Sequence, residues 1–322
     1  MVRHANPSSG KREGEGPGNV RIRGRHGESC RMIFRSLLVL AMLPVTAGAA
    51  APLPLAPHQA VYELALAPGS ADFVDAEGRI ALKLQSETCG TYALDYRFVA
   101  KFQQEEEVTV TDQQTISTEN VAGTEFSFTT KTFVDGSPEK EIRGAARREG
   151  NSTKVSMQSP QKQEVTLPLS YFPLQHTAAL IEHARAGERI VEAKLFDGDD
   201  DAGKLLTSTA IIGPSDLSAA GPAPVQPNAA AVAVEGAAKT EDATPAPGRA
   251  AAIDKELAGL QSWKISESYY NSDSDPDGMP IFETTYVLYE NGVSDQLTLN
   301  FGEYTFKGAL SQLELLQPGS CK

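Results

Sequence analysis

The sequence predicts a mainly all-β unit in which one short helix plugs or caps a curved sheet. Two observations predict it: polar and apolar residues alternate over much of the chain after residue 50, and one segment alone has a clear helical period. Hydrophobic residues make up 40% of the 322 positions, which is enough to build a core. The formal net charge of −13 argues against a sequence-independent nucleic-acid binder, because such proteins need excess positive charge.

The first 49 residues have the three-part order of a secretory signal peptide. Arg35 ends a positive flank, residues 37–43 form an apolar run, and residues 47–49 read Ala-Gly-Ala, as at a cleavage site. The run is too short for a bilayer span of about 20 apolar residues, and a core helix is the alternative interpretation. Because some thirty residues precede this segment, we expect translation to start at Met32 and the mature chain to begin near Ala50.

Charge divides the chain at the same point. Residues 1–49 contain eight Lys or Arg and three Asp or Glu, whereas residues 50–322 contain 21 and 39. The mature protein is therefore expected to be acidic. Because the leader has the order of a cleaved signal peptide, we also expect the mature protein to lie in an exported compartment and not to span a membrane.

Cysteine use fits an oxidising compartment. Cys30 lies in the segment that we expect to be removed, which leaves Cys89 and Cys321. An even number of cysteines in an exported protein favours a disulfide, so we predict a Cys89–Cys321 bridge. Two free thiols are the competing interpretation.

Strict alternation is clearest over residues 91–102, where Tyr96 and Phe98 fall on one face and Arg97 and Lys101 on the other. Such a pattern is typical of a half-buried antiparallel strand. The same pattern predicts strands over residues 79–85, 125–134, 263–270, 281–289 and 293–301. Asn291-Gly292, between two of these runs, predicts a hairpin with a type I′ turn, and residues 281–310 predict a three-stranded meander.

One segment breaks the period of two. Over residues 173–187 proline occupies the first helical position, apolar residues recur at spacings of three and four, and Gly187 suits the residue after the helix end. We therefore expect a short helix here.

Composition changes between residues 214 and 252. Residues 219–252 contain 14 Ala and 5 Pro with no aromatic residue, which predicts a disordered or extended insertion. A boundary between two independent domains is the alternative. We favour one β domain made of residues 50–213 and 253–322, because the predicted disulfide would join the two parts.

Catalytic and metal-binding signals are weak. The chain after residue 50 contains His58, His176 and His183, and none lies in a metalloprotease spacing. No nucleophile elbow, P-loop or dinucleotide motif is present, so no catalytic residue, metal ligand or cofactor is predicted, and a secreted hydrolase is disfavoured. The acidic segments 197–203 and 273–278 resemble half of a calcium loop but lack its distal Glu, so solvated turns are favoured.

Aromatic residues on the apolar faces have two interpretations. They can fill a core, or a curved sheet lined by them can hold an acyl chain or another apolar ligand. The residues concerned are Tyr92, Tyr96, Phe98, Phe102, Phe126 and Phe128.

Several segments, taken in order, resemble the EipB family of periplasmic cell-envelope integrity proteins, long described as a domain of unknown function. They include residues 56–64 and 89–92, the Phe172-Pro173-Leu174-Gln175-His176 segment, the Leu288-Tyr289-Glu290-Asn291-Gly292-Val293-Ser294 block, residues 301–314 and Cys321. The resemblance covers residues 56–321 apart from the Ala/Pro-rich insertion. The chain departs from it at Lys264, where a proline is usual, and in the length of the insertion.

The resemblance implies a β-spiral of long antiparallel strands wound around one short central helix. It also implies a periplasmic location and one disulfide, at Cys89 and Cys321, but no catalytic residue. Two functions follow as hypotheses. The first is a non-enzymatic protein that maintains envelope integrity and stress resistance by binding envelope components or partner proteins. The second is a carrier of a lipid or lipoprotein acyl chain.

Overall fold

The computed structural model describes residues 55–68, 73–88, 90–198, 202–215, 247–271 and 278–319. The predicted leader, most of the 214–252 insertion, and both Cys89 and Cys321 lie outside these residues. The predicted disulfide therefore stays a prediction.

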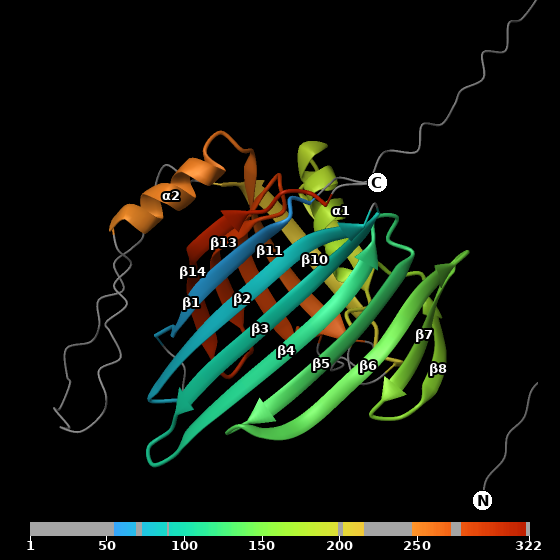
Figure 1. The fold of residues 1–322 in the computed structure, drawn as a ribbon, viewed down its shortest axis with the longest axis horizontal. Helices are drawn as coiled ribbons and strands as arrows, with labels where there is room; N and C mark the ends of the chain where they lie inside the picture. The colour runs from blue at the N-terminus through green and yellow to red at the C-terminus, as the bar shows by residue number, and fades with distance from the viewer. Residues whose placement is uncertain are drawn as a thin grey trace, which may run out of the picture. The chain divides into compact units, whose positions relative to one another are not determined.

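The described strands form one fourteen-stranded sheet in which every neighbouring pair is antiparallel (Figure 1). The strands before the first helix are β1 (His58–Leu66), β2 (Asp75–Thr88), β3 (Thr91–Gln103), β4 (Val108–Asn120), β5 (Glu125–Val134), β6 (Ser137–Glu149), β7 (Ser152–Ser159) and β8 (Gln163–Pro168). The remaining strands are β9 (Ile190–Leu195), β10 (Leu206–Pro214), β11 (Ser262–Asn271), β12 (Phe282–Tyr289), β13 (Ser294–Asn300) and β14 (Thr305–Leu315). The predicted fold class is confirmed.

The order of the strands shows how the sheet is assembled. It runs β8-β7-β6-β5-β4-β3-β2-β1-β14-β13-β12-β11-β10-β9. Strands that follow each other in the sequence therefore pair, except β8 and β9, which form the two edges of the sheet, and the first strand pairs with the last. The strands on either side of the insertion, β10 and β11, also pair directly. The insertion therefore leaves and rejoins the sheet between two neighbouring strands.

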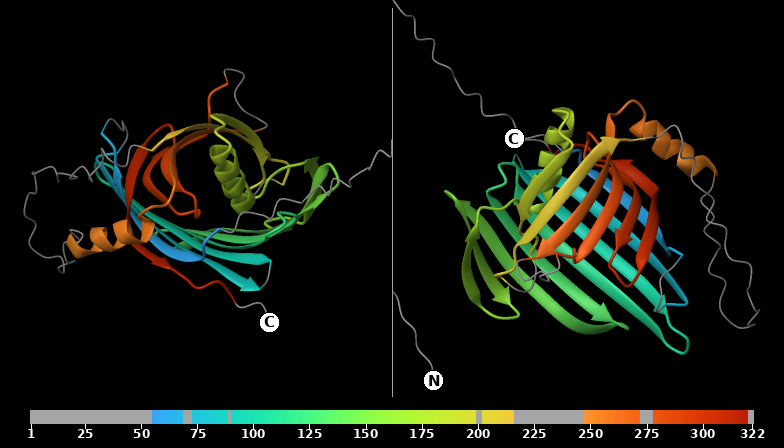
Figure 2. Two further views of the ribbon diagram at one scale, coloured as in Figure 1. Left: turned by 90° about the horizontal axis from the view of Figure 1, so that it is seen from above. Right: turned by 180° about the vertical axis from the view of Figure 1, so that it is seen from behind.

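The sheet curves into a barrel-like form around helix α1 (Pro173–Arg185), which lies on its concave side (Figure 2). The predicted helix is confirmed: Pro173 is in the first turn, and Gly187 has the positive φ of +79° expected just beyond the end. Leu180, Ile181 and Ala184 are buried in a cluster with residues of β10, β11 and β12.

A second helix, α2 (Pro247–Leu257), corrects two predictions. A single helix was expected, and residues 247–252 were placed in the disordered insertion. Alanine has the highest helix propensity, and the buried Ile253 and Leu257 anchor the helix against a core cluster that includes Tyr289 and Phe306. The Ala-rich composition of this segment is compatible with both a flexible segment and a helix, so composition alone could not decide between them.

The hairpin between β12 and β13 is confirmed, but its turn type differs from the prediction. The N–H of Tyr289 donates to the carbonyl of Val293 (2.9 Å), which closes a loop of three residues, 290–292, and of these only Gly292 has a positive φ, +89°. A three-residue loop needs a left-handed conformation at its last residue alone, whereas a type I′ turn needs two. A side chain at position 292 would also collide with Leu55, whose Cδ2 lies 2.8 Å from the place of a Cβ atom.

Candidate functional site

The N-terminus of α1 is capped by a carboxylate from a distant strand. Glu119 on β4 accepts hydrogen bonds from the backbone N–H of Leu174 (3.0 Å) and of Gln175 (2.7 Å). Proline at position 173 has no N–H, so these are the first two donors of the helix, and Phe172 at the N-cap supplies no side-chain acceptor. Glu119 thus performs the role that a local Ser or Asp usually has.

Burial changes the protonation of this cap. Glu119 is only 2% exposed, and burial raises its pKa to about 7, although the two backbone hydrogen bonds and the positive charge of Arg148 act in the opposite direction. Arg148 itself donates to the side chain of Gln175 (2.8 Å) and lies 5.7 Å from the ring centre of Tyr171.

A second buried carboxylate holds the first turn of α1 against the sheet. His176 Nε2 lies 2.8 Å from Glu267 Oε1 on β11, and both residues are 5% exposed or less. Ser208 donates to Oε1 (2.6 Å) and Tyr286 donates to Oε2 (2.6 Å). Burial alone would raise the pKa of Glu267, but the hydrogen bond and charge of His176, with the two hydroxyl donors, lower it below the ordinary value.

This cluster contains a serine, a histidine and a glutamate, but its geometry is not that of a catalytic triad. In a triad the serine and the carboxylate contact opposite nitrogens of the imidazole ring. Here Ser208 Oγ is 3.5 Å from the same Nε2 that contacts Glu267, and it donates its proton to the carboxylate. His176 Nδ1 has no hydrogen-bond partner within the described residues. The arrangement fastens the helix and does not activate a nucleophile.

The motif residues singled out from the sequence gather at the two ends of α1. Phe172, Pro173 and His176 form its start, and the loop after Tyr289 meets its last turn. There Glu290 pairs with Arg185 of α1 (2.8 Å).

The neighbouring loop residues hold the start of the chain's described part. The carbonyl of Asn291 accepts from the N–H of Ala56 (2.9 Å), and Gly292 leaves room for Leu55. Six of the motif residues therefore lie at the ends of α1 or hold Leu55 and Ala56, whereas Tyr289 is buried in the core cluster that covers α2. The remaining predicted site residues, Cys89 and Cys321, lie outside the described part.

Sequence reasoning missed Glu119, Ser208 and Glu267. A signal was present for the two acids, because each occupies a position on the inward face of its strand: Glu267 alternates with Ile265 and Tyr269. A carboxylate on the apolar face of a strand indicates a buried polar contact.

Away from α1, the concave side carries a continuous series of aromatic rings. Neighbouring ring centres are 4.9–5.7 Å apart along the series. We call it the aromatic row; in order of contact its members are Tyr269, Phe282, Phe301, Tyr304, Phe102 and Phe73. Every member is only partly buried, so this inward-facing apolar surface remains accessible to solvent.

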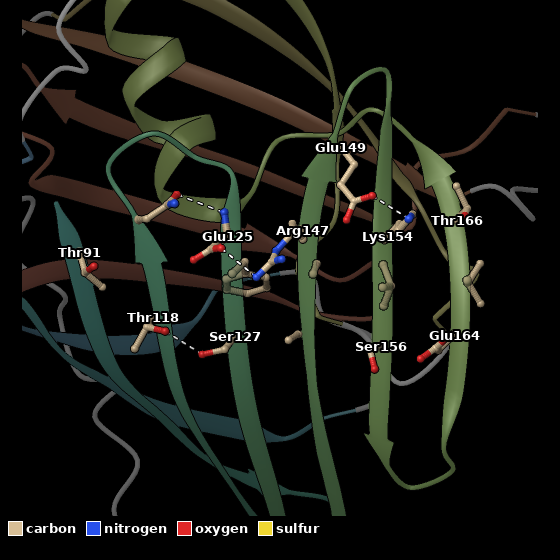
Figure 3. Close-up of a pocket in the computed structure, with 16 residues that line it drawn as sticks. Thr91, Thr118, Glu125, Ser127, Arg147, Glu149, Lys154, Ser156, Glu164 and Thr166 are labelled. Carbon is tan, nitrogen blue, oxygen red and sulfur yellow. Dashed lines mark hydrogen bonds and ion pairs between the residues drawn. The ribbon is translucent and has the colours of Figure 1, made fainter.

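A groove of about 780 Å³ crosses the opposite, outward side of β4 to β8 (Figure 3). Its central side chains are small, and two ion pairs stand beside them: Arg147 with Glu125 (3.0 Å) and Lys154 with Glu149 (2.6 Å). The polar side chains that line this outer groove are those of Thr91, Thr118, Asn120, Glu125, Ser127, Arg147, Glu149, Lys154, Ser156, Glu164 and Thr166.

Metal and membrane features were searched over the described ranges. In that part of the chain, no three His, Cys, Asp or Glu side chains gather so that they could hold a metal ion. The acidic segments 197–203 and 273–278 lie partly outside it. Neither α1 nor α2 is long and apolar enough to cross a membrane.

Comparisons with known proteins agree with the resemblance seen in the sequence. The model of the EipB-like family matches residues 49–238 and 226–317. The chain is 30% identical over 279 residues to the cell envelope integrity protein EipB of Brucella abortus (strain 2308), which covers 86% of this chain and 90% of that protein. A crystal structure of a β-barrel-like protein of the domain of unknown function DUF1849, from Brucella abortus, matches with a TM-score of 0.66 and 28% identity. That match covers 82% of this chain and 100% of the other.

Replacing His176 with Leu is expected to destabilise the fold by about 3–5 kcal/mol, because the buried Glu267 then loses the side chain that pairs with it. Chemical denaturation measures the change. The matched control is His183→Leu on the same helix, which breaks an exposed pair with Glu188 and should cost less than about 1 kcal/mol. Equal losses in the two variants would contradict the fastening role.

The Glu119 cap predicts a pH-dependent stability. Its pKa is raised from 4.5 to about 7 on folding, so its stabilising contribution is complete below pH 4.5 and is lost as the pH rises through 7. The unfolding free energy of the wild type minus that of Glu119→Gln should therefore fall between pH 4.5 and pH 7, by up to about 1.4 kcal/mol per pH unit. Denaturation at several pH values tests this, since taking the difference removes the other titrating groups. A flat or rising difference would show that the cap is ionised throughout.

Proposed function

Since the chain belongs to the EipB-like family, we propose that it maintains the integrity of the cell envelope from the periplasm, by binding and not by catalysis. The name of its relative from Brucella abortus supports the envelope role. The signal-like leader supports export. The geometry around His176, Ser208 and Glu267 supports a role without catalysis, because the serine is not placed to be activated.

The outer groove is the observation that carries the binding role. It has a volume in the range of ligand sites, and its side chains are exposed on the face of a sheet in which β5, β6 and β7 are each paired on both sides. Such a sheet is rigid, so the groove is already formed before a partner arrives. An envelope component or an envelope protein is the partner that this location implies.

Loss of the gene tests the role in cells. Cells without it are expected to become more sensitive to detergents and to cell-wall antibiotics, and a copy of the whole gene should restore resistance. A copy that lacks residues 2–49 should not, because its product would stay in the cytoplasm. Unchanged sensitivity of the deletion strain would contradict the envelope role, and full rescue by the leaderless copy would contradict the periplasmic location.

A second candidate function is that of a carrier for a lipid or lipoprotein acyl chain. The aromatic row favours it, because a continuous apolar surface on the concave side keeps contact with solvent. An acyl chain laid along these rings would remove apolar area from water without disturbing the packed core around α1.

Native mass spectrometry of protein purified from the periplasmic fraction tests the carrier function, together with uptake of a fluorescent fatty acid. A co-purifying lipid is expected, and Phe102→Gln should weaken uptake about tenfold because it interrupts the aromatic row. The control, Ile116→Gln, removes an apolar side chain that is 62% exposed on the outward face, and it should leave uptake unchanged. A ligand-free mass with no uptake would exclude the carrier.

A further inference from the structure

The floor of the outer groove is a row of small side chains that runs across the strands. Thr118 on β4 lies opposite Ser127 on β5, which lies opposite Ala145 on β6, which lies opposite Ser156 on β7. The hydroxyl groups of Thr118 and Ser127 are 2.7 Å apart (Figure 3). Because the row crosses at least four strands about 4.8 Å apart, it is long enough for a linear ligand that lies perpendicular to the strands.

Charged side chains stand along one side of this floor. Glu125, Arg147 and Lys154 face each other across β5, β6 and β7, in the register next to the floor. The paired side chains are 45–63% exposed, and exposed ion pairs contribute at most about 1 kcal/mol. A ligand can therefore take over some of these contacts at little cost, while the pairs keep the side chains oriented.

The chemistry of the groove disfavours three classes of ligand. An extended peptide that adds a strand needs a free sheet edge, but the floor lies on β4 to β7, which are paired on both sides, and the edge strand β8 lies at the end of the groove. An acyl chain needs apolar side chains, but Phe126 and Val155 are buried and occupy inward positions of their strands. An anionic polymer needs excess positive charge, but the lining has three carboxylates and two cations, which are both paired.

A neutral ligand with many hydroxyl groups requires neither a free sheet edge, nor apolar side chains, nor excess positive charge. Ser and Thr hydroxyls donate and accept, carboxylates accept from two hydroxyls at once, and a guanidinium donates in a planar fork. We infer that the outer groove binds a neutral glycan strand, laid along the Thr118–Ser127–Ala145–Ser156 floor with its hydroxyls on Arg147 and the neighbouring carboxylates. This inference rests on the proposed function, since it names the class of envelope component. Without an aromatic ring to stack on the sugars, the affinity should be modest, with a Kd on the order of 0.1–1 mM.

Titration of protein from the periplasmic fraction with two neutral hexasaccharides tests the inference. The probes are maltohexaose and β-1,4-linked N-acetylglucosamine hexamer, followed by amide chemical shifts in NMR. At least one is expected to bind and to shift the amides of Ser127, Ala145 and Ser156. Ala145→Ile adds three carbons to the floor in a residue that strands favour, and it should weaken binding at least about tenfold. The matched control is Ala81→Ile, on the outward face of β2 away from the groove, which should bind as the wild type does.

Three results would overturn the inference. They are no binding of either hexasaccharide up to about 10 mM, equal binding by Ala145→Ile and the wild type, and amide chemical-shift changes confined to residues of the concave side. Tighter binding of a heparin hexasaccharide than of both neutral probes would also overturn it, because it would show that charge selects the ligand. The proposed function is tested separately. If the deletion strain is sensitised and the Ala145→Ile variant fully restores resistance, the envelope role stands but does not depend on the outer groove.

Discussion

Two carboxylates inside the curved sheet determine how α1 is held, and the concave side is organised around that helix. Glu119 replaces the missing local cap, and Glu267 receives the imidazole of His176 together with two hydroxyls. A buried carboxylate is costly unless all its lone pairs have donors, and here the donors come from elements far apart in the sequence. These hydrogen bonds fix the helix relative to β4, β10, β11 and β12. They have a defined direction, whereas the apolar contacts of the surrounding core do not.

The same construction leaves two surfaces of opposite character. Around α1 the concave side is filled by Leu180, Ile181 and their neighbours, whereas the aromatic row beyond the helix keeps solvent contact. The outward face of β4 to β8 is polar, and it is hollowed where small side chains meet in register. Since neighbouring residues of one strand point to opposite faces, a single set of strands supports both surfaces. The two proposed ligands therefore have separate surfaces: an acyl chain would lie on the aromatic row and a glycan strand in the outer groove.

Some features could be read from local pattern because their cause is local. The alternation over residues 91–102 predicted β3 with its correct faces, and Pro173 with Gly187 predicted both ends of α1. The β12–β13 hairpin followed from Asn291-Gly292, but its turn type did not, because the loop length depends on how the two strands pair. Helix α2 was missed for a similar reason: it is stabilised by burial of Ile253 and Leu257, which requires the core of the sheet to be present.

By itself the sequence determined the fold class, the strands β2, β3, β5 and β11 to β14, the first helix and the family, since periodicity, turn residues and motif order are properties of short segments and their succession. Only the tertiary structure decided the partners of the buried acids. The separation of Glu119 from Leu174, or of His176 from Glu267, is too long for any spacing rule, and the contact exists because the sheet curves around the helix. The outer groove likewise depends on register, because Thr118, Ser127, Ala145 and Ser156 become one floor only when four strands align.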